Sequence, residues 1–176
     1  MTRAQRTHSN DIEARLAAAR AHDGAGRRKR AETIYRQVLK KDARNAGALH
    51  GLALIARRGG HAARAVQLLS KAVSAAPGDA AIRCDLGNAF KALGRFEDAL
   101  AQHRRMVELR PASPEALSNL GTTCAKAGRA DEALDHLRRA AELGPANAEV
   151  IYNLGNGLLS AGRFDEIGRA SCRERV

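Results

Sequence analysis

The chain has 176 residues and a formal net charge of +11, with 44% hydrophobic and only 3% aromatic residues. The hydrophobic residues are mostly Ala and Leu, which favour helices, and only four Pro interrupt the chain. We find no apolar run long enough to span a membrane and no apolar segment typical of a secretory signal. Three Cys without CxxC spacing argue against a disulfide framework, and we expect a cytoplasmic location.

The positive charge is concentrated at the two ends of the chain. Residues 1–45 carry a net charge of +7, residues 46–166 carry +2 and residues 167–176 carry +2. We expect residues 1–11 to form a basic N-terminal tail. The basic cluster at Arg27–Arg30 has no interleaved aromatic residues for base stacking, so we interpret it as a solvated face and do not expect nucleic acid as a partner.

From residue 12 onward the sequence repeats every 34 residues. The stretches beginning at Leu86, Leu120 and Leu154 read LGNAFKALGRFEDAL, LGTTCAKAGRADEAL and LGNGLLSAGRFDE. Self-similarity at this period is the signature of a repeat architecture. The units of the predicted repeat domain, residues 12–166, are 12–45, 46–79, 80–113, 114–147 and a partial unit at 148–166.

The positions shared by the units are those that a pair of packed helices requires. The eighth residue is always Ala or Gly, and the fifteenth is always Gly, which tolerates the left-handed backbone that ends a helix. The last residue is Asn, Asp or Ser, which caps the next helix. In the third unit we expect Leu86, Phe90 and Leu93 to share an apolar helix face. Stacked helical hairpins of this kind predict an all-α, right-handed superhelical solenoid.

This pattern resembles the tetratricopeptide repeat family over residues 12–166. The resemblance rests on Leu86-Gly87, Gly94 and Pro111 and on the same positions of the next unit. It implies that the first helices of the units line a concave groove through positions two, five, six, nine, twelve and thirteen. The candidate peptide-binding residues on this face are Asp85, Asn88, Lys91, Asn119, Thr122, Lys126, Tyr152, Asn153 and Asn156.

The candidate chemistry is binding rather than catalysis. Asn side chains both donate and accept hydrogen bonds, so we expect them to hold the backbone of a peptide or protein segment. HExxH, GxSxG and Walker motifs are absent, and the acidic pair Glu97-Asp98 is placed to favour a helix dipole. His103 and Cys124 occupy packing positions, and the six His show no metal-ligand spacing. We therefore predict a non-enzymatic interaction scaffold without a cofactor or metal site.

Two narrower hypotheses follow from the resemblance. Binding of a chaperone-tail carboxylate is disfavoured, because Cys84 stands where that group of repeat domains has Lys. The Asn spacing and the NLGN motif are also similar to the repeat regions of bacterial glycosyltransferases, such as O-linked N-acetylglucosamine transferases, and of sulfotransferases. This similarity implies an alternative function as the recruiting arm of a transferase whose catalytic domain is absent from the chain.

The repeat pattern stops at Ile167–Val176, which reads IGRASCRERV and has no helical apolar face. The string resembles, residue for residue, one reading frame of a common short-read sequencing adapter. We therefore expect it to be non-native and the native reading frame to have been cut near Asp165 or Glu166. Because the fifth unit is then incomplete, we expect Ile151, Leu154 and Leu158 to be uncovered and the C-terminal repeat to self-associate.

Overall fold

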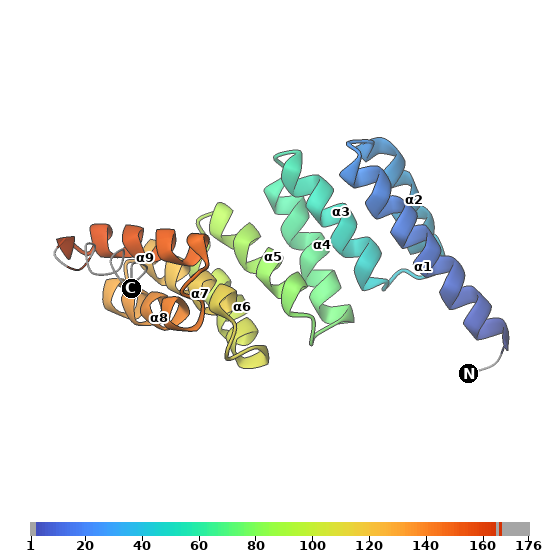
Figure 1. The fold of residues 1–176 in the computed structure, drawn as a ribbon. Helices are drawn as coiled ribbons and strands as arrows, with labels where there is room; N and C mark the ends of the chain where they lie inside the picture. The colour runs from blue at the N-terminus through green and yellow to red at the C-terminus, as the bar shows by residue number, and fades with distance from the viewer. Residues whose placement is uncertain (1–2, 165, 167–176) are drawn as a thin grey trace. The chain divides into compact units, whose positions relative to one another are not determined.

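The computed structural model describes residues 3–164 and 166, and in this part of the chain every regular element is an α-helix (Figure 1). The fold is an all-α helical-repeat solenoid, as the sequence predicts. No helix of the described residues is long and apolar enough to cross a membrane. The helices are α1 (Arg3–Gly24), α2 (Arg28–Lys41), α3 (Ala46–Arg58), α4 (Ala62–Ala75), α5 (Ala80–Ala92), α6 (Phe96–Leu109), α7 (Pro114–Lys126), α8 (Ala130–Leu143) and α9 (Ala148–Ser160).

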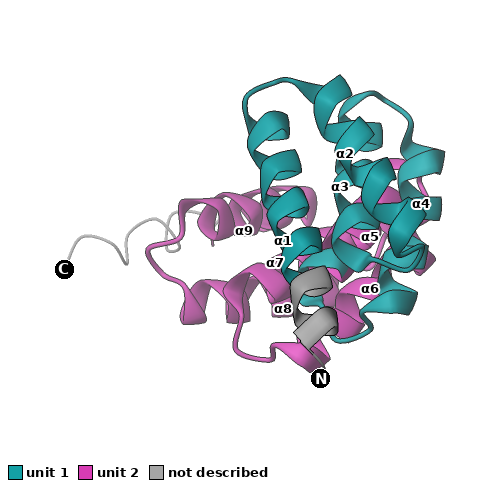
Figure 2. Ribbon diagram, turned by 90° about the vertical axis from the view of Figure 1, so that its right-hand side faces the viewer, with its two compact units in different colours: residues 1–82 teal, residues 83–176 magenta. Residues whose placement is uncertain are grey.

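The chain divides into two compact units, residues 1–82 and 83–176 (Figure 2). In the first unit, α3 packs against α1, α2 and α4, and α1 packs against α2. In the second unit, α7 packs against α6, α8 and α9, and α8 packs against α9. The first helix of a repeat thus contacts both its own second helix and a first helix of the neighbouring repeat.

The predicted boundaries of the repeat domain lie close to the two ends of the chain. Helix α1 begins at Arg3, so the described part of the expected N-terminal tail continues the first helix of the first repeat. Asp11 in this segment accepts hydrogen bonds from Lys41 Nζ at 2.9 Å and from Arg15 Nε at 3.0 Å, and these bonds lower the pKa of its carboxyl group. The expected non-native residues 167–176 lie outside the described residues.

Short polar side chains and glycines mark the ends of the helices, as the repeat pattern predicts. Asn45 Oδ1 accepts a hydrogen bond from the Ala48 amide at 3.0 Å, and Ser113 Oγ accepts one from the Ala116 amide at 3.2 Å. Asp79 and Asn147 cap α5 and α9 in the same way. The turn inside each repeat contains a Gly with φ between +70° and +79°, a conformation that L side chains rarely adopt. These glycines are Gly26, Gly60, Gly94, Gly128 and Gly162.

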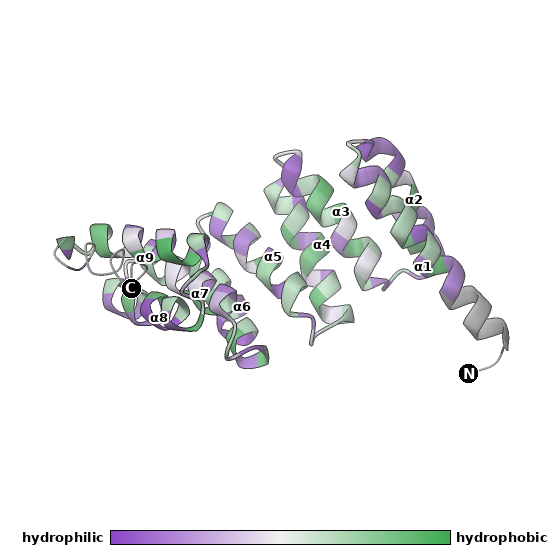
Figure 3. Ribbon diagram, viewed as in Figure 1, coloured by the Kyte–Doolittle hydropathy of each residue, from purple (hydrophilic) through white to green (hydrophobic). Residues whose placement is uncertain are grey.

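Hydrophilic and hydrophobic residues are mixed along each helix (Figure 3), and many of the hydrophobic side chains are buried. In the first unit, Leu16, Tyr35 and Val38 belong to one buried cluster. In the second unit, Leu134 and Leu137 of α8 form part of another. Each cluster draws residues from more than one repeat, so a single helical hairpin does not bury its own apolar face.

The structure corrects two expectations about apolar residues. Leu154 and Leu158, which we expected to be uncovered, are only 6% and 1% exposed, because they cluster with Leu134 and Leu137 of the preceding repeat. Leu93, which we expected on the apolar face of α5, follows the last residue of that helix and is 40% exposed. Self-association of the C-terminal repeat stays a prediction, but Leu154 and Leu158 do not supply its surface.

The small residue at the eighth position of a repeat is required by close contact with the second helix. A Cβ on Gly121 would lie 2.7 Å from Leu137 Cγ and 3.0 Å from the Ala133 carbonyl oxygen. A Cβ on Gly87 would overlap the ring of His103 in the same way. The side chains of the second helix therefore pack directly on the backbone of the first.

We expect Gly121→Ala to lower the free energy of unfolding by about 1–3 kcal/mol, because the added methyl group meets a backbone oxygen that cannot move without shifting α8. Chemical denaturation measures this change. Gly155→Ala is the matched control at the same position of the next repeat, where no atom of the described residues lies within 4 Å of the added Cβ. The control should be neutral or stabilising by up to about 1 kcal/mol. Equal losses in both variants would contradict the close-contact explanation.

His103 is fully buried, as its packing position predicts. Its Nδ1 lies 2.9 Å from Thr123 Oγ1, and this hydroxyl donates to the Asn119 carbonyl oxygen at 2.7 Å. The Thr123 hydroxyl thus lies between the imidazole of α6 and a backbone carbonyl of α7. Nε2 is buried without a hydrogen-bond partner among the described residues. Burial, assisted by the charge of Lys91 and opposed by the Cys84 carbonyl, lowers the pKa of His103 to about 4.

This buried histidine predicts a loss of stability in acid. The pKa falls from an ordinary value of 6.5 to about 4 on folding, so the unfolded chain binds more protons between these values. The neutral, buried His103 therefore contributes to the free energy of unfolding. This contribution, about 3 kcal/mol, is fully present above about pH 6.5 and is lost as the pH falls through about 4. The measurement compares unfolding free energies at pH 7 and pH 4 with those of His103→Leu, since Leu69 and Leu137 occupy this position in other repeats. An equal pH dependence in both proteins would rule out His103 as its source.

Candidate functional site

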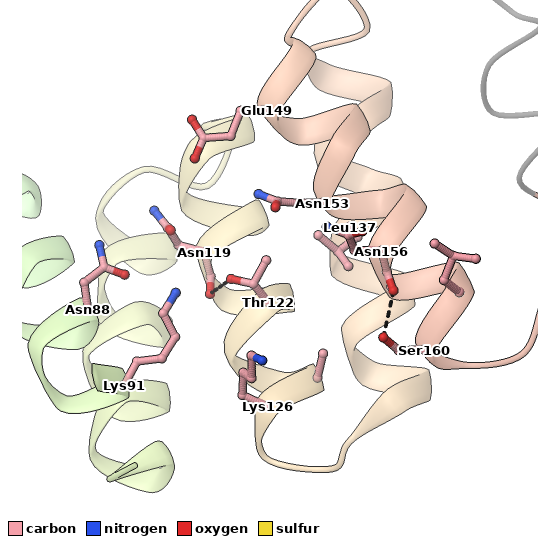
Figure 4. Close-up of a pocket in the computed structure, with 13 residues that line it drawn as sticks. Asn88, Lys91, Asn119, Thr122, Lys126, Leu137, Glu149, Asn153, Asn156 and Ser160 are labelled. Carbon is pink, nitrogen blue, oxygen red and sulfur yellow. Dashed lines mark hydrogen bonds between the residues drawn. The ribbon is translucent and has the colours of Figure 1, made fainter. Parts of the chain in front are cut away.

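A pocket with a volume of about 600 Å³ lies in the second unit, among α5, α7 and α9 (Figure 4). We call it the inner pocket. Seven of the nine predicted contact residues line it, whereas Asp85 and Tyr152 do not. The seven are Asn88, Lys91, Asn119, Thr122, Lys126, Asn153 and Asn156. Side chains from equivalent positions of three successive repeats therefore meet in one space.

Six further residues line the inner pocket without having been predicted. Four of them hold the second, twelfth or thirteenth position of a repeat, so the same positional rule could have found them: Ala125, Glu149, Leu159 and Ser160. The other two, Leu137 and Gly157, do not follow the rule. Leu137 reaches the pocket from α8 beside Gly157, where a Cβ would lie 2.7 Å from Leu137 Cδ1.

Hydrogen bonds between repeats fix the orientation of the pocket amides. Asn153 Nδ2 donates to Ser118 Oγ at 3.0 Å, and Asn119 Nδ2 donates to Cys84 Sγ at 3.3 Å. Both bonds join position six of one repeat to position five of the repeat before it. Each of these amides keeps a second N–H and a carbonyl oxygen with acceptor capacity. The inner pocket thus offers a repeated donor and acceptor pair whose orientation is set before any ligand arrives.

The inner pocket also contains two lysines, Lys91 and Lys126. The Lys91 side chain points from α5 toward α7 (Figure 4). Burial lowers the pKa of Lys91, and the charge of Lys126 acts in the same direction, against the opposing effects of Cys84 and Glu149. Among the described residues, neither ammonium group forms an ion pair. The pocket therefore has positive charge that a bound anionic group would neutralise.

The acidic pairs at the starts of second helices take part in ion pairs. In the first turn of α6, Glu97 Oε1 lies 2.8 Å from Arg129 Nη2 of the next repeat. In the first turn of α8, Glu132 Oε1 lies 3.0 Å from Arg104 Nη2 of the repeat before. These bonds raise the pKa of Arg129 and lower that of Glu132. The carboxylates link adjacent repeats at the surface.

The other candidates from the sequence lie outside the inner pocket. Cys124 is fully buried, as predicted, and burial followed by the Glu132 carboxylate raises the pKa of its thiol to about 11. The thiolate required of a nucleophile is therefore disfavoured. The basic residues Arg27–Arg30 are exposed at the N-terminal end of α2, where Arg27 Nε donates to His22 Nδ1 at 2.9 Å.

Several solved structures share this fold. The MamA protein superposes with a TM-score of 0.77 at 21% identity, over 90% of this chain and 87% of that chain. YrrB, described as a TPR protein with an unusual peptide-binding site, gives 0.74 at 23% identity, over 95% and 87%. TTC0263, a thermophilic TPR protein of Thermus thermophilus, gives 0.72 at 23% identity, over 92% and 89%. At these identities the likeness shows the fold alone.

No curated protein matches the sequence at a significant level. The family comparison, in contrast, matches the tetratricopeptide repeat over residues 16–80 and 84–148, which together make up most of the chain. These stretches contain α2, α3, α4, α6, α7 and α8 in full, four of the five glycine turns and seven of the thirteen residues that line the inner pocket. The chain therefore belongs to the tetratricopeptide repeat family.

Proposed function

We propose that this protein is a non-catalytic interaction scaffold that binds an extended peptide or protein segment in the inner pocket. The observation that carries the proposal is the convergence of polar side chains from three successive first helices on one open space. YrrB, a protein of the same fold, is described as having a peptide-binding site, and this supports the same class of ligand here.

The pocket amides suit the backbone of an extended chain. Packed helices lie about 8–10 Å apart, whereas an extended chain advances about 3.3 Å per residue. One amide from each repeat would therefore meet about every third residue of the ligand. Because Asn119 and Asn153 are already held by bonds to the preceding repeat, they lose little side-chain freedom when the ligand binds.

The charges of the pocket favour a ligand with an acidic group. Lys91 is half-buried and its pKa is lowered, so a carboxylate placed beside it would stabilise the ammonium form. Lys126 lines the same pocket and its charge acts on Lys91, so both positive charges would attract an acidic group placed beside Lys91. Glu149, which also lines the pocket, would disfavour a second acidic group close to α9. We infer that the ligand carries its acidic residue toward α5 and α7.

The alternative function, a recruiting arm of a glycosyltransferase or sulfotransferase, stays a prediction that no described residue tests. It would use the same inner pocket. The expected cytoplasmic location also stays a prediction.

The proposal is tested by selecting peptides from a random displayed library against the full chain and measuring the affinity of the selected peptides by fluorescence anisotropy. We expect the selected peptides to be enriched in Asp and Glu. Lys91→Met should weaken their binding by about tenfold to a hundredfold, because a hydrogen-bonded charge contributes about 1.5–3 kcal/mol. The double variant Asn119→Ala with Asn153→Ala should weaken it by about tenfold.

Two matched substitutions outside the pocket serve as controls. Asn10 of α1 and Lys71 of α4 are both exposed, and Asn10→Ala and Lys71→Met should leave the affinity unchanged. Circular dichroism checks that every variant remains folded. Selected peptides that bind the pocket variants as tightly as the parent chain would show that they bind elsewhere and would overturn the proposal. Failure to select any peptide would also count against it.

A further inference from the structure

A cluster of three potential metal ligands lies between α7 and α8, apart from the residues that line the inner pocket. Cys124 comes from α7, whereas Glu132 and His136 lie one turn apart on α8. The ligand atoms of all three side chains lie within 4.8 Å of one another. The spacing of each residue type along the sequence gives no sign of this cluster, because only the packing of α7 on α8 brings the three together.

We propose that Cys124, Glu132 and His136 form a binding site for Zn²⁺ or a similar thiophilic divalent transition metal. Sulfur, imidazole nitrogen and carboxylate oxygen are the three ligand types that zinc takes in proteins. Three protein ligands with water in the fourth position complete its usual tetrahedral coordination. The thiolate ligand disfavours Mg²⁺ and Ca²⁺, which prefer sites made entirely of oxygen.

The geometry needs only small side-chain movements to close around an ion. Zinc bonds of about 2.0–2.3 Å hold tetrahedral ligand atoms about 3.5 Å apart, somewhat closer than the 4.8 Å limit seen here. Cys124 is fixed in a buried cluster with Leu100 and Leu120, so its sulfur is a rigid anchor. Glu132 and His136 are only partly buried, so they can rotate toward the sulfur and leave a path for the ion from solvent.

The surrounding arginines are arranged so that a metal can share the Glu132 carboxylate. Arg104 Nη2 lies 3.0 Å from Oε1, while Arg129 Nη1 lies 3.5 Å from Oε2. A metal bound through Oε2 would leave the Arg104 bond in place, and this bond would orient the carboxylate as an outer-shell partner. Arg129 would keep its two bonds to Glu97, at 2.8 and 2.9 Å. Metal binding therefore leaves both guanidinium groups paired.

The bound ion would receive two anionic ligands and one neutral ligand. The Cys124 thiol releases its proton to solvent as the sulfur–metal bond forms. The thiolate and the Glu132 carboxylate supply two negative charges to the metal, and His136 binds as neutral imidazole, while the Arg104 guanidinium stays paired with the same carboxylate and leaves the site with a net positive charge. The bound ion would join α7 to α8 and stabilise the hairpin of the fourth repeat.

The test uses Co²⁺ as a spectroscopic probe and Zn²⁺ as the competing metal. The sequence contains three cysteines, so the full chain carries Cys84→Ser and Cys172→Ser, which leaves Cys124 as the only thiol. We expect Co²⁺ to produce the near-ultraviolet charge-transfer band of a cobalt–thiolate bond and Zn²⁺ to abolish that band by displacement. Zn²⁺ should also raise the melting temperature of this parent protein.

The proposal is decided by variants of Glu132 and His136, the two partly buried ligands. Cys124 belongs to the core, so its replacement can disturb folding. His136→Ala and Glu132→Gln should each weaken Zn²⁺ binding at least about tenfold and remove the stabilisation by the metal. His61→Ala, at an exposed histidine of the first unit, is the matched control and should behave as the parent. The absence of a cobalt–thiolate band in the parent, or equal Zn²⁺ affinity in all variants, would overturn the proposal.

Discussion

The direct packing of a second helix on the backbone of the first is the contact on which the rest of the structure depends. At Gly87 and Gly121 the absence of a side chain leaves room for His103 and Leu137. The glycine at the fifteenth position, with its positive φ, returns the chain so that the two helices meet at this point. Because both requirements recur every 34 residues, equivalent positions of successive repeats face the same way.

The inner pocket follows from this recurrence. Helices α5, α7 and α9 carry no sequence motif that would identify a binding site in isolation, yet each supplies at least one amide to the same space from its sixth or ninth position: Asn88, Asn119, Asn153 and Asn156. The bonds from Asn119 to Cys84 and from Asn153 to Ser118 show how the same contact orients these amides and joins one repeat to the next. Stability between repeats and the presentation of polar groups to a ligand are thus provided by the same side chains.

The 34-residue period could be read directly from the sequence. The helix caps and the glycine turns could be predicted because each depends on only a few neighbouring residues. The residues that line the pocket could be predicted where the position in the repeat determines which way the side chain points. Tyr152 departs from the rule. At the same position of earlier repeats, Cys84 and Ser118 each accept a hydrogen bond from an Asn of the following repeat. No described repeat follows that of Tyr152, and its side chain is 69% exposed. Cys124, Glu132 and His136 occupy different repeat positions on two helices. The periodicity of the sequence therefore does not predict that they lie close together.

The link between the third and fourth repeats has a consequence for how the array can evolve. His103 at position twenty-four meets Thr123 at position ten of the next repeat, whereas Leu137, its counterpart, meets Gly157. Exchanging one repeat for another would set a leucine against a hydroxyl or leave the imidazole without its hydroxyl partner. A repeat moved to another place in the array would therefore need a second substitution, at position ten of the repeat that follows it, to restore this contact.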